Sequence, residues 1–599
     1  MPVSPSAEYT QRLRDREAQV ADFEKVHVRM GNVRVLLAAA IAVAGWLSIS
    51  RHAFSLWWLF LPIAAFVAAG WYHSRVLDGR ARAERAVAVY RDGLARIEDC
   101  WEGNGQTGER FNVPHYVYAA DLDLFGKGSL FELLSTARTR MGEDTLAQWL
   151  LAPSAVEVIQ ERHVALSELR DRLDLREALA VLGEDSKVGV HPEALLTWAA
   201  APNRLTQRWL RWLAPLLAVF AVVCAVVWAV WGLATPFVVV VVLEVLITRS
   251  FKKQLTEIFH ATEHAFANLD LLSALLARLE CEQFLAPRLR VLKGQLASHN
   301  LAGSRAIARL RTIVQFVESR RNPFVRFLDA PFMYSVQVAF SAEAWRRAHG
   351  HAVRFWIDGT GEIEALISIA TYSYEHPLDP FPEIVNSEQP DMAASFVGEE
   401  LGHPLIPTSK CVRNSVRICG DTRVLLVSGS NMSGKSTLLR TVGINTVLAM
   451  AGAPVRARSL QLSPLQVGAS IRVNDSLHEG NSRFYAEITR LRQIYGLAGH
   501  TPPLLFLLDE LLQGTNSHDR RIGAEGIVRA FVELGAIGLI STHDLALTDI
   551  GGIAQGSLEN VHFQDELEDG KMKFDFTLRE GVVTKSNGLE LMRSIGLKV

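Results

Sequence analysis

Residues 424–443, VLLVSGSNMSGKSTLLRTVG, constrain the fold of this chain more than any other stretch. An apolar run typical of a buried strand enters a loop of small residues, and a helix-like pattern follows the loop. The loop, residues 429–436, fits G-x-x-x-x-G-K-[ST] in full, and a strand before the loop and a helix after it are the context that this motif requires. We therefore predict an α/β domain with a phosphate-binding loop.

The chemistry of such a loop predicts the roles of its residues. Glycines let backbone N–H groups turn toward a phosphate, at a helix N-terminus whose dipole favours anions. Lys435 is expected to reach the β- and γ-phosphates of ATP, and the Ser436 hydroxyl to ligate Mg²⁺. A chance glycine loop is the alternative, and the full match disfavours it. The predicted ATP-binding residues are Gly429, Ser430, Asn431, Met432, Ser433, Gly434, Lys435, Ser436 and Thr437.

Two later apolar runs end in polar residues that suit the same site. The run LLFLLDE (504–510) ends in two acids: Asp509 is expected to hold Mg²⁺ through water, and Glu510 to polarise the attacking water. The run GAIGLISTH (535–543) ends at His543, and the carboxyl ends of parallel strands share one crevice. We predict that His543 senses the γ-phosphate; the alternative is a structural or surface histidine.

Two pairs of charge-poor apolar runs predict membrane segments. The runs are residues 35–50, 53–74, 212–231 and 233–248. A bilayer core about 30 Å thick needs roughly 20 apolar residues in a helix, and Arg, Lys and Trp at the ends of the runs match the positive-inside rule and the aromatic belts. We expect two transmembrane hairpins with cytoplasmic flanks; buried core helices of a soluble protein are the alternative. Glu244 is the one charge inside the second pair, so anchoring is favoured over transport.

Composition adds little about partners. The net charge of −2 gives no global case for a polyanion, and five scattered cysteines without a C-x-x-C pair disfavour disulfides and zinc. Residues 285–354, however, contain mostly basic charges. This stretch could follow nucleic-acid phosphates, lie on anionic lipid headgroups, or pack its arginines against neighbouring residues. The sequence leaves these three interpretations open.

Several motifs together resemble one family. They are SGSNMSGKSTLLRTVG, then residues 471–491 (IRVNDSLHEGNSRFYAEITRL), 507–519 (LLDELLQGTNSHD), 541–550 (STHDLALTDI) and 560–597. Their order and spacing are similar to those of a MutS-type ATPase domain, which is of the ABC type with composite ATP sites at a dimer interface. Upstream, residues 118–168, 359–373 and 396–406 resemble the MutS core, or lever, and the lead-in to the ATPase.

The resemblance implies further roles. Ser482, in EGNSRF, would contact the γ-phosphate bound by a partner protomer; the alternative is that Ser482 only caps its own helix. Glu487 and the turn at 514–517 would lie at or near that dimer interface. Two features depart from the family. Residues 1–100 lack the Phe-x-Glu wedge of the mismatch-reading domain, and residues 407–419 lack the aromatic that stacks on adenine.

We therefore expect an α/β P-loop ATPase domain of ABC type at the C-terminus, preceded by an all-α MutS-like core or lever that transmembrane helical hairpins interrupt. The expected segments are a cytoplasmic N-terminal segment (1–34), a first hairpin (35–74), the first part of the core (75–211), a second hairpin (212–248), a helical lever and return part of the core (249–395) and the ATPase domain (396–599).

The expected function is ATP hydrolysis with Mg²⁺ by a homodimer in the inner (plasma) membrane, with the core and ATPase domains cytoplasmic. The family likeness predicts that the dimer binds mismatched or structured DNA. The alternative is an ABC-type ATPase that drives conformational signalling or membrane remodelling without DNA. An ABC exporter is disfavoured because the apolar runs interrupt a lever. The sequence does not identify protein partners.

Overall fold

A computed structural model describes most of the chain. The described residues are 4–51, 55–113, 116–182, 192–205, 207, 209–265, 269–297, 302–385, 394–430, 432–472, 483–513, 515–543, 557–568 and 571–583. The chain forms two compact units. Unit 1 comprises Met1–Thr136, Thr145–Arg172 and Leu366–Val599, and unit 2 comprises Ala137–Asp144 and Leu173–Ala365.

Unit 1 contains a six-stranded sheet in the order β10-β9-β4-β8-β7-β6. β10 is antiparallel to β9, and the other neighbours are parallel. The strands are β4 (Val424–Ser428), β6 (Gln466–Ser470), β7 (Leu504–Leu508), β8 (Ile537–Thr542), β9 (Leu558–Glu568) and β10 (Lys571–Glu580). Every residue of β4, β7 and β8 is buried, as continuous apolar runs in a parallel sheet predict.

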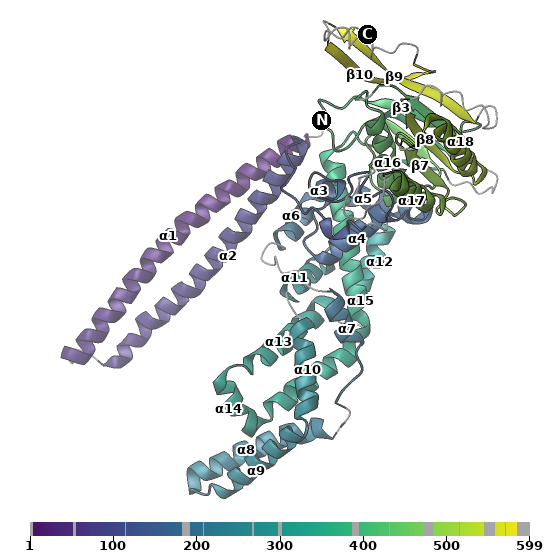
Figure 1. The fold of residues 1–599 in the computed structure, drawn as a ribbon. Helices are drawn as coiled ribbons and strands as arrows, with labels where there is room; N and C mark the ends of the chain where they lie inside the picture. The colour runs from purple at the N-terminus through teal and green to yellow at the C-terminus, as the bar shows by residue number, and fades with distance from the viewer. Residues whose placement is uncertain are drawn as a thin grey trace. The chain divides into compact units, whose positions relative to one another are not determined.

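Three helices accompany this sheet: α16 (Lys435–Ala451), α17 (Arg483–Tyr495) and α18 (Ser517–Glu533) (Figure 1). α16 packs on β6, β7 and β8, and α17 packs on β6. A smaller sheet has the order β1-β5-β2-β3. Its strands are β1 (Glu383–Ile384), β2 (Phe396–Leu401), β3 (Asn414–Ile418) and β5 (Ser459–Leu462). The predicted α/β domain at the C-terminus is confirmed.

The N-terminal part of unit 1 is a long helical hairpin, α1 (Pro5–Arg51) and α2 (Phe60–Ile97), whose arms lie side by side (Figure 1). Each arm is one continuous helix across the boundary that we predicted, at residue 34 or residue 74. The base of this α1–α2 hairpin is fixed by Glu375, whose buried carboxylate accepts two hydrogen bonds from Arg96 (2.7 and 2.8 Å) and one from Tyr9 (3.3 Å). Three shorter helices follow: α3 (Leu130–Leu134), α4 (Arg140–Leu151), whose first turn belongs to unit 2, and α5 (Val156–Arg170).

Unit 2 is helical in its described residues. Its helices are α6 (Leu173–Leu182), α7 (Pro192–Ala200), α8 (Leu210–Trp231), α9 (Thr235–Ser250), α10 (Lys252–Ala265), α11 (Leu269–Glu280), α12 (Pro287–Leu296), α13 (Gly303–Ser319), α14 (Pro323–Phe332) and most of α15 (Tyr334–Glu375). α11 and α13 pack together through leucine and isoleucine side chains at helical spacing. The predicted helical region before the ATPase domain is confirmed.

α8 and α9 form a second hairpin with an apolar outer surface. Small residues of α8, including Ala221 and Cys224, pack against Val240 and Phe237 of α9. Valine, leucine and phenylalanine side chains point outward along both helices, whereas the acidic Glu244 is 0% exposed. A helix pair in water has the opposite arrangement, with its charges outside and its apolar groups inside.

By length and composition, two helices in the described part of the chain could cross a membrane, fewer than the four spans that we predicted. Among the described residues, α1 and α8 are long and apolar enough to cross a membrane, a property that a soluble core helix or a signal sequence also meets. Their hairpin partners do not meet the test, and α9 has 16 residues. Transmembrane insertion therefore stays a prediction.

Four arginines of the basic stretch 285–354 form ion pairs with acids in the fold. Arg288 forms two hydrogen bonds with Glu362 (2.6 and 2.7 Å), and the buried Arg346 pairs with Glu343 (2.6 Å). Further ion pairs join Arg311 to Asp270 and Arg354 to Asp358. For the buried Arg346 and the partly covered Arg288 the structure shows the third interpretation, packing against neighbouring residues, whereas the pairs of Arg311 and Arg354 are exposed to solvent.

Candidate active site

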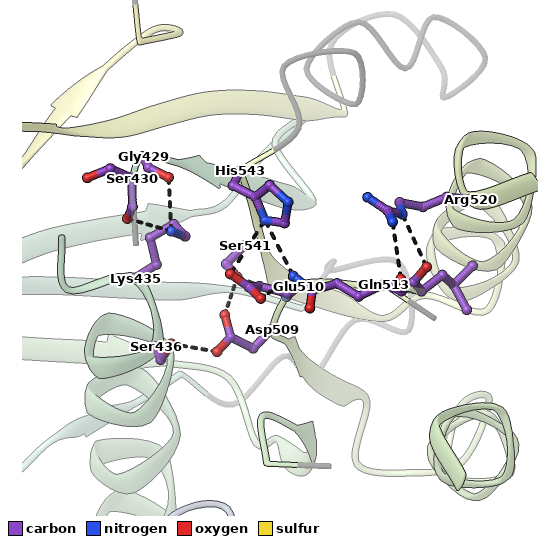
Figure 2. A network of polar contacts seen from close by, with 11 residues as sticks. Gly429, Ser430, Lys435, Ser436, Asp509, Glu510, Gln513, Arg520, Ser541 and His543 are labelled. Carbon is purple, nitrogen blue, oxygen red and sulfur yellow. Dashed lines mark hydrogen bonds and ion pairs between the residues drawn. The ribbon is translucent and has the colours of Figure 1, made fainter. Parts of the chain in front are cut away.

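The predicted phosphate-binding loop joins β4 to α16. Gly429 permits a close approach, since a Cβ at this position would lie 2.8 Å from Ser433 Oγ and 3.2 Å from Phe563 O. Lys435 begins α16, is 5% exposed, and donates from Nζ to Gly429 O (2.9 Å) and Ser430 O (2.8 Å), as Figure 2 shows. The lysine is thus folded onto the loop whose ligand it is predicted to bind. Asn431 lies outside the described residues.

Ser436 and Asp509 meet at the loop although 73 residues separate them in the sequence. Ser436 Oγ donates to Asp509 Oδ2 over 2.5 Å, and Ser541 of β8 donates to the other carboxylate oxygen, Oδ1 (Figure 2). Asp509 follows β7 directly, and β8 lies between β7 and β4. The strand order therefore places the carboxylate between two hydroxyls. These hard oxygen donors are the ligands that Mg²⁺ prefers, so the residues present fit a Mg²⁺ site.

Glu510 and His543 face one another at the ends of β7 and β8. His543 Nδ1 lies 3.5 Å from Glu510 Oε1, and Gln513 Nε2 donates to Glu510 Oε2 (Figure 2). The Glu510 N–H donates to Ser541 Oγ (3.0 Å), and Glu510 has a φ of 50°, in the left-handed region. The structure therefore brings together the predicted base and the predicted sensor. Our sequence reasoning missed Ser541 and Gln513.

The loop after Glu510 is held by side chains of two helices. Arg520 of α18 donates to the carbonyls of Leu512 (3.1 Å) and Gln513 (3.2 Å) (Figure 2). Glu487 of α17 is 6% exposed and accepts the Leu512 N–H (2.5 Å). Glu487, which we expected near a dimer interface, thus binds a loop of its own protomer.

Burial lowers the pKa of Lys435, and the carboxylates of Glu510, Asp509 and Asp565 partly oppose this effect. An anionic phosphate beside Nζ would favour the charged ammonium in the same way as these carboxylates. The site therefore provides a desolvated cation whose charge a bound polyphosphate would stabilise.

Phe576 of β10 is a site residue that the sequence did not reveal. The β9–β10 register shifts between Phe574 and Leu578, and Asn414 of β3 fixes this irregularity: its Nδ2 donates to Phe576 O (2.9 Å) and its Oδ1 accepts the Leu578 N–H (2.7 Å). Phe576 has a φ of 55°, and its Cδ1 lies 3.2 Å from the position that a Cβ on Gly434 would occupy. An exposed aromatic ring therefore stands beside the phosphate-binding loop.

Part of the expected site lies outside the described residues. Ser482, the predicted trans residue, belongs to this part, as does Gly514 of the turn at 514–517. Asn516 of that turn is described, and its side chain caps α18 by accepting the Asp519 N–H (2.9 Å). The roles of Ser482 and of the turn at a dimer interface stay predictions.

Comparisons with known proteins agree with this site. Residues 425–598 match the family described as MutS domain V. Endonuclease MutS2 of Thermus thermophilus is 35% identical over 198 residues, which are 33% of this chain and 25% of the relative. DNA mismatch repair protein MutS of Brevibacillus brevis is 33% identical over 236 residues (38% and 26%), and MSH3 of Phaeosphaeria nodorum is 30% identical over 250 residues (40% and 22%). The chain thus covers about a quarter of these relatives, and the matches support the MutS family.

Proposed function

We propose that this chain is a membrane-anchored ATPase of the MutS type. One observation carries the ATPase assignment: Ser436 of the phosphate-binding loop and Asp509 after β7 meet at 2.5 Å beside Lys435. In nucleoside triphosphatases with a phosphate-binding loop, a hydroxyl of the loop and a carboxylate that follows a neighbouring strand hold Mg²⁺ at the phosphates. The names of the relatives and the match to MutS domain V support the same assignment.

The residues divide the work of hydrolysis. Ser436 and Asp509 would hold Mg²⁺, which when bound neutralises charge on the phosphate oxygens. Lys435 would exchange its bonds to Gly429 O and Ser430 O for phosphate oxygens. Glu510, oriented by Gln513, would accept a proton from the attacking water, and His543 would contact the γ-phosphate.

Phe576 is proposed to stack on the adenine. Its ring is 42% exposed and lies beside Gly434, at the start of the helix that receives the phosphates. Every base presents a π-face, so an exposed aromatic at this position can hold it. This assignment supplies the aromatic that residues 407–419 lack.

We further propose that two protomers close over two ATP molecules and that each lends Ser482 to the other. This part rests on the resemblance of the EGNSRF motif. Hydrolysis would reopen the dimer, and the resulting movement would pass along the lever helices.

Membrane anchoring rests on the surface of the α8–α9 hairpin. Its outer surface is apolar and its one acidic residue, Glu244, is buried. Exposed basic residues, among them Arg211, Arg249 and Lys252, follow at its base, as the positive-inside rule expects of cytoplasmic flanks. The α1–α2 hairpin likewise exposes large apolar side chains, among them Trp46 of α1 and Trp71 of α2. The proposed location is the inner (plasma) membrane, with the core and ATPase domains cytoplasmic.

We propose two candidates for the molecule on which the ATP-driven movement acts: DNA, and the membrane or its proteins. The relatives that are named DNA mismatch repair proteins favour DNA that is mismatched or structured. The pairing of Arg288, Arg311, Arg346 and Arg354 with acids lowers the net positive charge that this stretch offers to DNA. This pairing favours the second candidate, an ATPase that acts on the membrane or on membrane proteins without DNA.

The ATPase proposal is tested with Glu510→Gln in the full chain, purified in detergent. We expect the variant to bind ATP with unchanged Kd and to hydrolyse it at least about 100-fold more slowly, because general base catalysis contributes about 10²–10⁴-fold. Glu533→Gln, at an exposed carboxylate near the end of α18, is the control and should not change either value. Unchanged turnover in Glu510→Gln would contradict the catalytic assignment.

The choice of partner is tested by the ATPase rate of the wild-type chain with homoduplex, mismatched or branched DNA at two salt concentrations. Stimulation that weakens as salt rises supports DNA, because phosphate contacts release counterions. Absence of DNA binding at low salt, together with stimulation by anionic lipid, supports the second candidate.

A further inference from the structure

The short helix α14 lies between α13 and the long helix α15, and hydrogen bonds fix both of its ends. At its N-terminus the Asn322 side chain accepts the Phe324 N–H (3.0 Å), and Pro323 occupies the first turn. At its C-terminus Met333 is left-handed, with a φ of 45°. Asp329 accepts both the N–H (2.6 Å) and the hydroxyl (2.8 Å) of Ser335 at the start of α15. The Asp329–Ser335 hydrogen bonds therefore tie α14 to the start of α15.

The preceding turn is held as firmly. Arg320, at the end of α13, donates from Nε to Ser335 Oγ (2.9 Å), and its guanidinium stacks over the ring of Phe259 in α10 (3.6 Å). Arg320, Asp329 and Ser335 thus link the end of α13, α14 and the start of α15 in one polar cluster. A force on α14 would reach α15 without passing through a loose loop.

α14 nevertheless exposes large aromatic side chains. Phe324 is 70% exposed and Phe327 is 77% exposed, and their i, i+3 spacing places them on one face of the helix. Exposing two phenylalanines on a ten-residue helix to water is unfavourable, and such a patch marks a surface that binds a protein or a membrane.

The covering medium is indicated by the neighbours of α14. The helix packs against both α8 and α9 (Figure 1), the hairpin whose outer surface is apolar and whose acidic residue is buried. A helix of ten residues is about 15 Å long and is too short to cross a bilayer core of about 30 Å. A short amphipathic helix beside a membrane hairpin lies in the plane of the interface, with its apolar face at the acyl boundary.

The charges around α14 match lipid headgroups. Arg321 is exposed just before α14, and Arg326 is exposed in the middle of α14. The exposed basic residues where α9 ends and α10 begins are Arg249, Lys252 and Lys253. Basic residues at the edge of a membrane hairpin attract the phosphates of anionic lipids. DNA is the weaker match, because it would meet exposed phenylalanines on this face, whereas phosphate backbones are bound by basic and polar groups.

We propose that α14 is an interfacial membrane helix that inserts Phe324 and Phe327 at the acyl boundary and binds anionic phospholipid through Arg326 and Arg321. The proposal rests on the membrane anchoring of the α8–α9 hairpin. Because α14 is joined to α15, the bilayer would act on the lever helix at this point, and ATP-driven movement of α15 would act on the bilayer.

The test is photocrosslinking with p-benzoylphenylalanine in place of single phenylalanines of the full chain, reconstituted into nanodiscs of phosphatidylcholine and phosphatidylglycerol. The substituted positions are Phe324 and Phe327 in α14, Phe220 on the outer surface of α8, and Phe355 on α15. Phe355 is the matched control, since it is 52% exposed and also belongs to unit 2, and each replacement keeps an exposed aromatic ring. Adducts are identified by mass spectrometry after irradiation.

We expect lipid adducts at Phe220, Phe324 and Phe327 in severalfold higher yield than at Phe355. If Phe220 forms lipid adducts but the lipid-adduct yields at Phe324 and Phe327 do not exceed the yield at Phe355, this inference is overturned and the membrane anchor is left intact. Adducts of Phe324 or Phe327 to a second copy of the chain, or to added duplex DNA, in place of lipid would also overturn it. No lipid adduct at Phe220 would overturn both the anchor and the inference.

The lipid class is tested by charge removal in the same experiment. In Arg326→Gln the ratio of phosphatidylglycerol to phosphatidylcholine adducts at Phe327 should fall severalfold. Arg347→Gln removes an exposed arginine of α15 and should leave the ratio unchanged. Equal ratios in the two variants would overturn the assignment of Arg326 to anionic headgroups.

Discussion

Replacing Phe576 tests whether an aromatic side chain of β10 binds the base of ATP. Phe576→Asn removes the ring, and asparagine is suited to the backbone because it tolerates the left-handed φ of 55° found there. Phe576→Trp keeps an aromatic face. Because the Asn414 hydrogen bonds go to main-chain atoms of Phe576 and Leu578, neither change removes them.

The expected loss follows from the exposed area of the ring. A phenylalanine offers roughly 200 Å² for burial, so a 42% exposed residue leaves about 80 Å² for a ligand to cover. Covering this area at about 25 cal/mol per Å² gives about 2 kcal/mol, within the range of about 1–3 kcal/mol for base–aromatic stacking. Phe576→Asn should therefore raise the Kd for ATP about 30-fold.

The assay is equilibrium binding of ATP and of inorganic tripolyphosphate to the detergent-purified chain. Stacking predicts that Phe576→Asn weakens ATP binding but not tripolyphosphate binding, and that Phe576→Trp binds ATP nearly as well as the wild type. Phe574→Ala, at the neighbour whose ring stacks on Phe576 at 6.0 Å, controls for general disturbance of β10. Equal losses for both ligands would refute the reasoning, because Phe576 would then act through the shape of the loop.

The remaining predictions concern stability. Burial raises the pKa of Glu364 to about 7 from 4.5, so the folded state binds more protons than the unfolded state. The contribution of Glu364 to stability is therefore full below pH 4.5, and about 3 kcal/mol is lost as pH rises through 7. Glu364→Gln should remove this loss: its unfolding free energy should exceed that of the wild type at pH 8 but not at pH 4, and an equal difference at both would contradict the protonation. Gly538→Ala should lower the free energy of unfolding by about 3 kcal/mol or more, because the new Cβ would lie 2.3 Å from Phe506 O. The matched control Gly526→Ala, in open space on α18, should stabilise the protein slightly. Equal effects of the two substitutions in thermal unfolding would contradict the packing.

The parts of the fold that depend on local sequence were predictable. Continuous apolar runs gave β4, β7 and β8, and the glycine loop gave the start of α16, since both signals are contiguous in the chain. The meeting of Asp509 with Ser436 was expected because both residues were assigned to one Mg²⁺ ion. Glu510 and His543 were expected in the same crevice because the carboxyl ends of parallel strands meet at one edge of the sheet.

Residues placed by long-range contacts were not predictable in this way. The position of Phe576 depends on a bulge that Asn414 fixes from 162 residues away. Arg288 pairs with Glu362, which lies outside the stretch 285–354, so the composition of that stretch does not reveal the pair. Ser541 had a usable signal, since it lies on β8 two residues before His543, which directly follows the strand, and alternate side chains share one face of a strand.

The ends of helices could not be predicted from the limits of the apolar runs. The expected boundaries at residues 34 and 74 followed the change from polar to apolar composition, but α1 and α2 continue through both. Composition tracks the medium around a helix, whereas the helix itself continues as long as its backbone hydrogen bonds do.

The most direct test of the central claim, an ATP site in which Ser436 and Asp509 act on one Mg²⁺, is a double-mutant cycle on Mg²⁺-dependent ATP hydrolysis. The rates of Ser436→Ala, Asp509→Asn and the double variant are measured over a range of Mg²⁺ concentrations in the full chain. We predict that the activity of the double variant is little lower than that of the less active single variant, because both side chains act on one ion. Independent losses that multiply in the double variant, or hydrolysis that needs neither residue, would contradict the account.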